Sequence, residues 1–272
     1  MMDLQSHSTY SDGELPPAEV VAAAVEAGVT TLALTDHDGI DGVAEAGAAA
    51  KEAGIVLVPA TEISCVHGSI DDMHMLGYWV DTIAIAPACK RAQRERVTRA
   101  EEIVERLNAQ GVHVTFEDAI AQAGDASSVG RPHIAKAAGV SPEGMSAFFE
   151  EWLVPGAKAF VSRRWPDAAE AIEIIHGAGG SAVLAHPFWD MDDPNSVAAL
   201  IDDLDLEGVE CFYPAHDRAQ TKFLLEVCGD RGLAATASSD FHGPNHKMFD
   251  SFLAYPTYDL GEPELPPGRT TD

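Results

Sequence analysis

Residues 30–38, TTLALTDHD, decide how this chain is expected to fold. A short run of β-branched and aliphatic residues leads directly into two aspartates and a histidine. This pattern is typical of a buried strand that ends beside polar residues. Helix patterns precede and follow it at residues 16–28 and 41–54, and each of them ends in glycine. The stretch therefore predicts one strand of a sheet whose strands alternate with helices.

The same alternation continues toward both ends of the chain. Further strand patterns lie at residues 2–5, 55–63, 72–80, 181–187, 208–214 and 233–242, and further helix patterns lie at residues 167–180, 195–204 and 219–232. Seven strands interleaved with helices predict an α/β fold with a parallel sheet, closed into a barrel.

The middle of the chain follows a different pattern. Helix patterns follow one another, with no strand-like run between them, at residues 90–111, 115–124, 131–139 and 144–153. Residues 89–166 are therefore predicted to form an all-helical insertion that caps the substrate site. Residues 1–88 and 167–272 would form the barrel domain, with a proline-rich tail, residues 261–272, that is loosely held.

Composition is that of a globular protein with a sizeable core, because 46% of the 272 residues are hydrophobic. No apolar stretch approaches the length of about 18 residues that a membrane span needs. No signal-peptide pattern opens the chain. The four cysteines form no C-x-x-C pair and are expected to be free thiols in the cytoplasm.

Charge is distributed unevenly along the chain. The formal net charge is −27, so the protein as a whole should repel nucleic acid and form no stable complex with a duplex. Residues 90–164 nevertheless contain 11 basic and 10 acidic residues, a net of +1, which leaves 6 basic and 34 acidic residues elsewhere. These basic side chains fit either solvated helix faces or contacts with an anionic substrate.

Histidines and carboxylates recur in or just after the predicted strands. They are His7, Asp12, Asp36, His37, Asp38, Glu62, His74, His186, His216, Asp240 and His242. Any one of them is explained equally well by turn chemistry or by a hydrogen-bonded histidine. Parallel barrel strands, however, bring their carboxyl ends to one mouth, where catalytic groups gather. A joint set of imidazoles and carboxylates without cysteine suits zinc, iron or manganese.

Six stretches carry a family resemblance: DLQSHSTYSDG, ALTDHD, PATEIS, MHMLGY, LAHP and SSDFHG, which start at residues 3, 33, 59, 73, 184 and 238. Their order and residue types resemble the PHP (polymerase and histidinol phosphatase) family of metal-dependent phosphoesterases. The resemblance covers essentially the whole chain and is strongest to members with a helical insertion. It implies a distorted seven-stranded (β/α) barrel with two or three divalent ions, iron, manganese or zinc.

The resemblance also implies three sets of metal ligands. They are His7, Glu62 and Asp240 with Gln5, then Glu62, His74 and His186, and then Asp12, His37 and His242. His67 is an alternative to His74. Gln5 stands where a histidine would complete an H-x-H pair with His7, and its amide oxygen is a weaker ligand than imidazole. Because the other eight positions carry ligating residues, we interpret Gln5 as part of a working variant.

The implied activity is hydrolysis of a phosphate ester by a metal-activated hydroxide. Arg131 and His133 are candidates to bind the substrate phosphate, although their segment also reads as a helix start. His216 is predicted to act as a general acid or phosphate contact, or to be a surface loop histidine. We expect a small substrate, a nucleotide or a short 5′-phosphorylated RNA. Histidinol phosphatase and a non-catalytic metal- or nucleotide-binding module are the alternatives.

Overall fold

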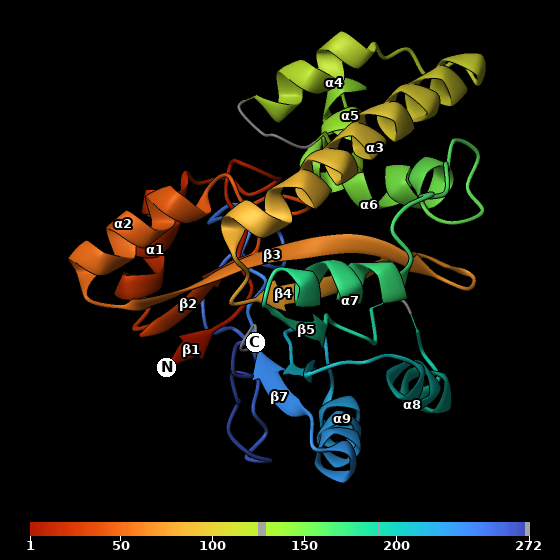
Figure 1. Cartoon of the computed structure of the whole chain (residues 1–272). Helices are drawn as coiled ribbons and strands as arrows, with labels where there is room; N and C mark the ends of the chain where they lie inside the picture. Colours follow the sequence, from red (N-terminus) through yellow and green to blue (C-terminus); the bar gives the residue numbers. More distant parts are fainter. Residues whose placement is uncertain (125–128, 190, 270–272) are drawn as a thin grey trace.

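A seven-stranded sheet forms the centre of the protein. The computed structural model describes residues 1–124, 129–189 and 191–269. Its strands, which are neighbours in chain order, are β1 (Met2–Asp3), β2 (Thr31–Leu34), β3 (Val56–His67), β4 (Ile70–Tyr78), β5 (Ser181–Leu184), β6 (Gly208–Phe212) and β7 (Ala234–Ala237). The Leu4 amide donates to the Ala237 carbonyl and the His7 amide to that of Phe241. These bonds bring β1 beside β7, so the predicted distorted barrel is confirmed as a nearly closed one (Figure 1).

One strand runs against the predicted direction. β4 is antiparallel to both β3 and β5, whereas the other hydrogen-bonded neighbours are parallel. Only Gly68 and Ser69 connect β3 to β4, and Gly68 adopts a φ of 57° that favours glycine. Because a parallel return needs a crossover of about a dozen residues, this short connection forces a hairpin. The prediction of a wholly parallel sheet is therefore wrong.

Helices cover the outside of the barrel. α1 (Pro17–Glu26) and α2 (Val43–Ala53) pack on β2, and α7 (Ala168–Gly177), α8 (Pro194–Asp203) and α9 (Arg218–Arg231) pack along β4 to β7. The barrel interior is filled by Leu4, Ala33, Val58, Ala60, Leu76, Tyr78, Val183 and Ala185. Among the residues that the structure describes, no helix is long and apolar enough to cross a membrane.

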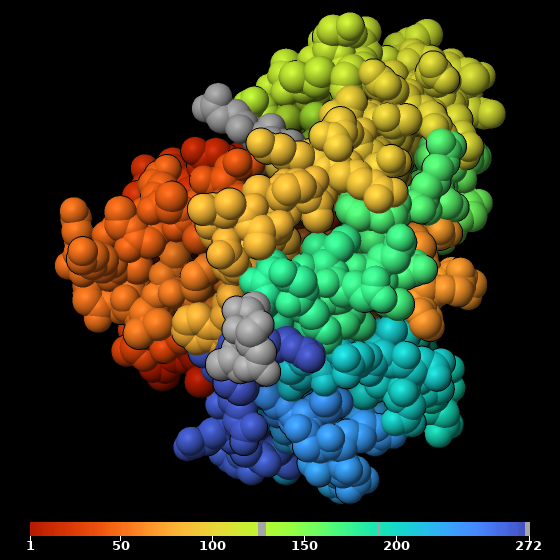
Figure 2. All heavy atoms as spheres, in the orientation of Figure 1, coloured from red at the N-terminus to blue at the C-terminus, as the bar shows by residue number. Residues whose placement is uncertain are grey.

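The helical segment stands over one side of the barrel (Figures 1 and 2). It contains α3 (Thr82–Ala109), α4 (Phe116–Ala123), α5 (Arg131–Ala137) and α6 (Met145–Phe148), followed by a π-helical turn at Phe149–Leu153. α3 begins before residue 89, because the Asp81 side chain accepts hydrogen bonds from the amides of Ile83 and Ala84 and caps the helix. Its first turns pack in the barrel core, and its second half packs in a separate core with α4 and α5.

The C-terminal segment is held more firmly than its proline content suggests. The Trp79 indole donates to the Pro266 carbonyl at 2.9 Å, and the Arg269 amide donates to the Gly179 carbonyl at 3.1 Å. The Arg269 guanidinium also pairs with the Glu207 carboxylate at 2.5 Å. The expectation of a loosely held tail is therefore wrong for residues 261–269, while residues 270–272 lie outside the described residues.

Candidate active site

Eight of the nine predicted metal ligands lie together in one cluster, in which His7, Glu62, His186 and Asp240 are buried and the other four residues are partly buried. Their ligand atoms form overlapping groups, within each of which the atoms lie no more than 4.8 Å apart. The groups are His7, Asp12, His37 and His242, then His37, Glu62 and His74, and then His7, Glu62 and Asp240. His186 joins them through Glu62, with its Nε2 atom 3.3 Å from Oε1. We call these eight residues the ligand cluster.

The carboxylate of Glu62 lies at the centre of the ligand cluster. Its Oε2 atom is 3.1 Å from His7 Nε2 and 3.3 Å from His37 Nδ1. Its Oε1 atom is 2.8 Å from His74 Nδ1 and 3.3 Å from His186 Nε2. Each oxygen therefore faces its own pair of imidazoles, which is the arrangement needed to bridge two metal ions.

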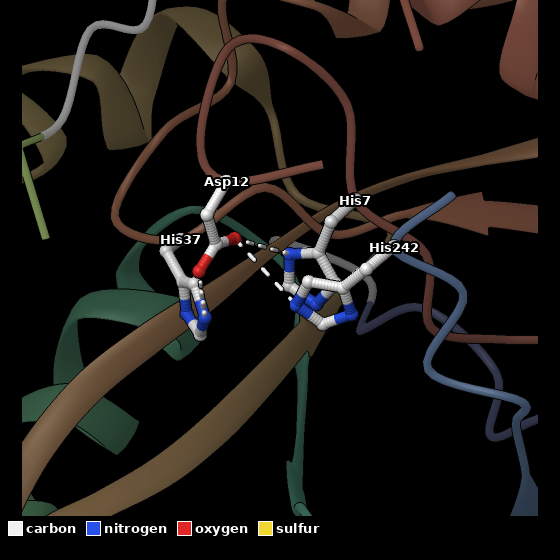
Figure 3. Close-up of side chains that lie close together, drawn as sticks. All are labelled: His7, Asp12, His37 and His242. Carbon is white, nitrogen blue, oxygen red and sulfur yellow. Dashed lines mark ion pairs between the residues drawn. The ribbon is translucent and has the colours of Figure 1, made fainter. Parts of the chain in front are cut away.

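Asp12 is the second carboxylate of the cluster that has several histidines around it. Figure 3 shows its carboxylate between the His37 ring and the rings of His7 and His242. Its oxygens are 3.8 Å from both His7 Nδ1 and His37 Nε2, and 3.6 Å from His242 Nε2. These separations exceed hydrogen-bond lengths, so the groups face a common point without bonding directly to one another.

Several buried atoms of the cluster have no hydrogen-bond partner, which is costly in a protein interior. They are His7 Nε2, Asp12 Oδ1, His37 Nδ1, Glu62 Oε2, His186 Nδ1 and Asp240 Oδ1. Burial would raise the pKa of Glu62, but His37 and His74 hold that pKa well below its usual range. Burial lowers the pKa of His37 to about 3. Burial opposes the charged form of His186 as well, but the hydrogen bond to Glu62 raises that pKa to about 9. A divalent ion would displace such protons from the imidazoles, so the unpartnered carboxylate and imidazole atoms fit metal binding.

Strand alternation explains how β3 and β4 deliver their ligands. Ala60 faces the barrel interior, and Glu62, two residues later, faces the same side. On β4 the same period relates His74 to the interior residue Leu76. Glu62 thus lies within β3, not at its end as predicted, because the hairpin continues beyond the mouth. The alternative ligand, His67, lies near the hairpin turn, outside the grouped residues.

A second aspartate shapes the loop that carries His7 and Asp12. Asp36 is buried, and its carboxylate accepts from the Ser8 amide, the Ser8 hydroxyl and the Ser11 hydroxyl, each at 2.7 Å. The loop also passes very close to itself, since a Cβ atom on Gly13 would lie 2.3 Å from the His7 carbonyl oxygen. Asp36 therefore positions ligands through the loop without belonging to the ligand cluster.

Three of the seven described non-glycine residues with a positive φ lie at this site. Asp38, His186 and Asp240 have φ values of 51°, 24° and 55°, in the left-handed region that residues other than glycine rarely adopt. His186 and Asp240 belong to the ligand cluster, and Asp38 follows the ligand His37. Such strain persists only where the surrounding structure enforces it, and it is concentrated at functional sites.

Gln5 is buried at the edge of this site, but no described contact joins it to the ligand cluster. Its Oε1 atom lies 3.4 Å from the Ser238 hydroxyl, and its Nε2 atom has no partner. Ser238 in turn donates to Glu210 at 2.5 Å. Burial raises the pKa of Glu210 to about 8, which favours the neutral form of this acid behind Gln5. Glu210 was not predicted as a functional residue. Its position as a lone acid in the apolar strand GVECFYP could have indicated it.

An arginine-lined cleft opens beside His37 and His74. It has a volume of about 100 Å³, and its cationic lining residues are Arg96, Arg99, Arg131 and Arg163. Arg96 and Arg163 face Asp38, whereas Arg99 and Arg131 face Asp72. Four guanidinium groups against three carboxylates, since Asp12 also lines the cleft, leave a small excess of positive charge. Of these arginines, the sequence analysis identified Arg131 alone.

Two of the arginines that line the cleft have a hydrogen-bond donor without a partner. Arg99 Nη2 and Arg163 Nε are buried without a partner. Burial, together with the charge of Arg163, lowers the pKa of Arg99 to about 9. Arg131, by contrast, already binds Asp72 and the Leu153 carbonyl. The unsatisfied cations therefore mark the cleft as a place for an anion.

The two predicted substrate histidines lie in different surroundings. His133 is buried, and its Nδ1 atom accepts the Gly130 amide at 3.0 Å, so the ring caps α5. His216 is also buried, with Nδ1 3.2 Å from the Cys211 carbonyl oxygen and Nε2 without a partner. Burial lowers its pKa to about 4. The alternative reading of His216 as a surface loop histidine is wrong.

Comparisons with known proteins agree with this geometry. A family model described as PHP domain matches residues 3–124. A 3′,5′-nucleoside bisphosphate phosphatase from Chromobacterium violaceum is 35% identical over 89% of this chain and 87% of its own length. A 5′-3′ exoribonuclease from Haemophilus influenzae is 37% identical over 89% of this chain and 90% of its own. A solved amidohydrolase from Chromobacterium violaceum, with bound sulfate and no metal, covers 91% of this chain and 89% of its own at 32% identity and a TM-score of 0.82.

The loop geometry gives a first prediction. Gly13→Ala should lower metal affinity and hydrolysis at least about tenfold, because the added Cβ would collide with the His7 carbonyl and displace Asp12. Gly229→Ala is the matched control, since a Cβ there meets nothing within 4 Å. Metal titration and turnover of both variants provide the measurement. Equal behaviour of the two variants would contradict the role given to the loop.

Proposed function

Because this chain belongs to the PHP domain family, we propose that it hydrolyses phosphate esters of nucleotides or of short 5′-phosphorylated oligonucleotides. The observation that carries the proposal is the ligand cluster around Glu62, with an arginine-lined cleft directly beside it. The curated relatives described above are a nucleotide phosphatase and an exoribonuclease. Both enzymes break phosphate ester bonds, which favours the same reaction class here.

The ligand cluster would hold two or three divalent ions. Glu62 would bridge one set containing His7 and Asp240 and a second set containing His74 and His186. Asp12, His37 and His242 would form the third set, and Gln5 would complete the first through its amide oxygen or a water. Ions in such a site supply a nucleophile at neutral pH and neutralise charge on the phosphoryl oxygens. Mixed imidazole and carboxylate ligands support iron, manganese or zinc.

The protein's own cations would bind the rest of the substrate. A phosphoryl group at the ligand cluster would lie at the His37 and His74 side of the cleft, whose lining includes Arg99 and Arg163, each with an unpaired donor. Arginine binds phosphate oxygens through parallel hydrogen bonds. Residues 89–166 would thus cap the site, as predicted, because α3 and α5 supply Arg99 and Arg131.

The alternatives are less well supported. Histidinol phosphate carries one phosphate, and the relatives act instead on nucleoside bisphosphates and RNA. A non-catalytic module would not need eight ligands converging on a bridging carboxylate. His216 has a free Nε2 atom for a substrate contact, whereas His133 uses Nδ1 to cap α5.

We also propose a cytoplasmic location, which is supported by four free buried cysteines.

The proposed function is tested by a substrate screen with purified protein and added manganese. Nucleoside monophosphates, 3′,5′-bisphosphates, short 5′-phosphorylated RNAs and histidinol phosphate are compared by phosphate release. We expect turnover of at least one nucleotide or RNA substrate and its loss in chelator. Turnover of histidinol phosphate alone would overturn the substrate class, and turnover of none would overturn the enzymatic proposal.

Removing a cluster ligand should abolish hydrolysis without unfolding the chain. Asp240→Ala or His186→Ala should lower the rate at least about 100-fold, since each takes a ligand from a metal set. Elemental analysis should find at least two metals per unmodified chain and fewer in the variants. Asp202→Ala, which removes an exposed partner of Arg231, is the control. A variant rate within a few-fold of the unmodified rate would refute the ligand assignment.

Gln5→His tests the variant position directly. Imidazole is the stronger ligand, so this change should slow the loss of metal to a chelator and retain hydrolysis. The side chain at this position is buried, and Ser238 and Glu210 offer it hydrogen-bond partners. Chelator titration followed by metal release and rate is the measurement. Unchanged metal affinity together with an unchanged rate would show that Gln5 does not face the metals.

Arg131→Ala should raise the KM for a nucleotide far more than that for a small generic phosphate ester. The expected loss is about 2 kcal/mol, or roughly 30-fold, which is typical of a charged hydrogen bond. Part of the effect comes through Asp72, which loses its partner and leaves Arg99 displaced. Arg231→Ala, on the far surface pair with Asp202, is the control. Equal KM changes for both substrates would place Arg131 at the reacting phosphate or in a structural role.

A further inference from the structure

An exposed tryptophan stands beside the ligand cluster. Trp189 is 51% exposed, whereas the rings behind it, Tyr213 and Phe249, are only 1% and 7% exposed. The Trp189 ring centroid is 6.3 Å from that of Tyr213 and 5.9 Å from that of Phe249. Its amide donates to the His186 carbonyl at 2.8 Å. The indole is therefore held by packing and by its backbone, yet it leaves half of its surface to solvent.

The three rings are continuous with the ligand cluster. The Trp189 ring lies 6.3 Å from the ring of His186, and the Tyr213 hydroxyl donates to Asp240 at 2.9 Å. The Phe249 ring is 5.6 Å from that of His242. This aromatic wall thus borders the cluster at His186 and His242. The arginine-lined cleft borders it at His37 and His74 instead.

The arginine-lined cleft and the aromatic wall differ in chemistry. Together they fit a ligand that carries both a phosphate and a flat ring. The cleft offers unpaired guanidinium donors, which suit a phosphate. The aromatic wall offers a half-exposed indole packed against two further rings, which suits a flat ring. An exposed aromatic side chain is a common platform for stacking nucleobases. A nucleotide bound by its phosphate at the cluster carries a base one ribose away, within reach of a ring so close to His186.

We infer that Trp189 is the stacking platform for the substrate's nucleobase, with Tyr213 and Phe249 as its support. This inference rests on the proposed function, and it names the element that would distinguish nucleotides from other phosphate esters. The sequence analysis assigned no role to Trp189. The platform accepts any base, because stacking depends on a π-face and not on a hydrogen-bond pattern.

The test compares binding of two non-hydrolysable probes to metal-loaded protein. One is a phosphonate analogue of adenosine monophosphate, and the other is the same compound without its base. Calorimetry gives the ratio of their affinities for the unmodified chain and for Trp189→Ala, Trp189→Phe and Ile83→Ala. Ile83 is 85% exposed on α3 and serves as the surface control. Binding is read without turnover, so a failure of the proposed hydrolysis does not obscure the result.

We expect Trp189→Ala to lower the preference for the base-containing probe by about 5- to 140-fold, the range of one base–aromatic stack. Trp189→Phe should restore most of that preference, and Ile83→Ala should leave it unchanged. Nucleotide binding should also quench the fluorescence of the unmodified chain more than that of Trp189→Phe. The inference is overturned if Trp189→Ala weakens both probes equally, if it weakens neither, or if the unmodified chain shows no preference for the base.

Discussion

A buried carboxylate must be paired or must coordinate a metal, and in this protein that constraint falls on Glu62. Its partners are His7, His37, His74 and His186, which come from four separate segments of the chain. These segments meet only when the barrel has formed, because β1, β2, β4 and β5 each lead to one of the four rings. The fold and the site therefore depend on one another, since the sheet gathers the imidazoles and the imidazoles satisfy the acid inside the sheet.

Sequence patterns predicted the parts of this arrangement that have a local cause. Strand and helix alternation follows from hydrophobic periodicity and from glycine at helix ends, and both can be read residue by residue. The members of the ligand cluster were candidates because each stands in or after a predicted strand, and the resemblance to the PHP family selected them as ligands. The direction of β4 was missed, although the two residues between His67 and Ile70 are too few for a helical crossover. Connection length was a better guide to strand direction than the overall alternation.

Other features could not be predicted because they arise from spatial neighbours far apart in sequence. Asp36 looked like a possible ligand, but its serine partners make it a loop anchor. Arg99 and Arg163 look like ordinary helix and loop cations until their donors are found buried and unpaired. Asp38 also looked like a possible ligand, but its carboxylate pairs with Arg96 and Arg163 instead of binding metal. In each case the sequence showed the residue type but not the neighbours that the residue meets in the folded chain.

The manner in which the barrel closes has a consequence for how the protein is made. β1 pairs with β2 on one side, but its neighbour on the other side is β7, and the segment up to Arg269 ties down the ends of β4 and β5. A ribosome delivers the chain from its first residue onward, so the second side of β1 stays unpaired for more than two hundred residues. During that time the acidic and imidazole side chains of the first four strands lack the partners supplied by His186 and Asp240. The nascent chain can form helices α1 to α5 early, but it acquires a competent site only at the end of synthesis.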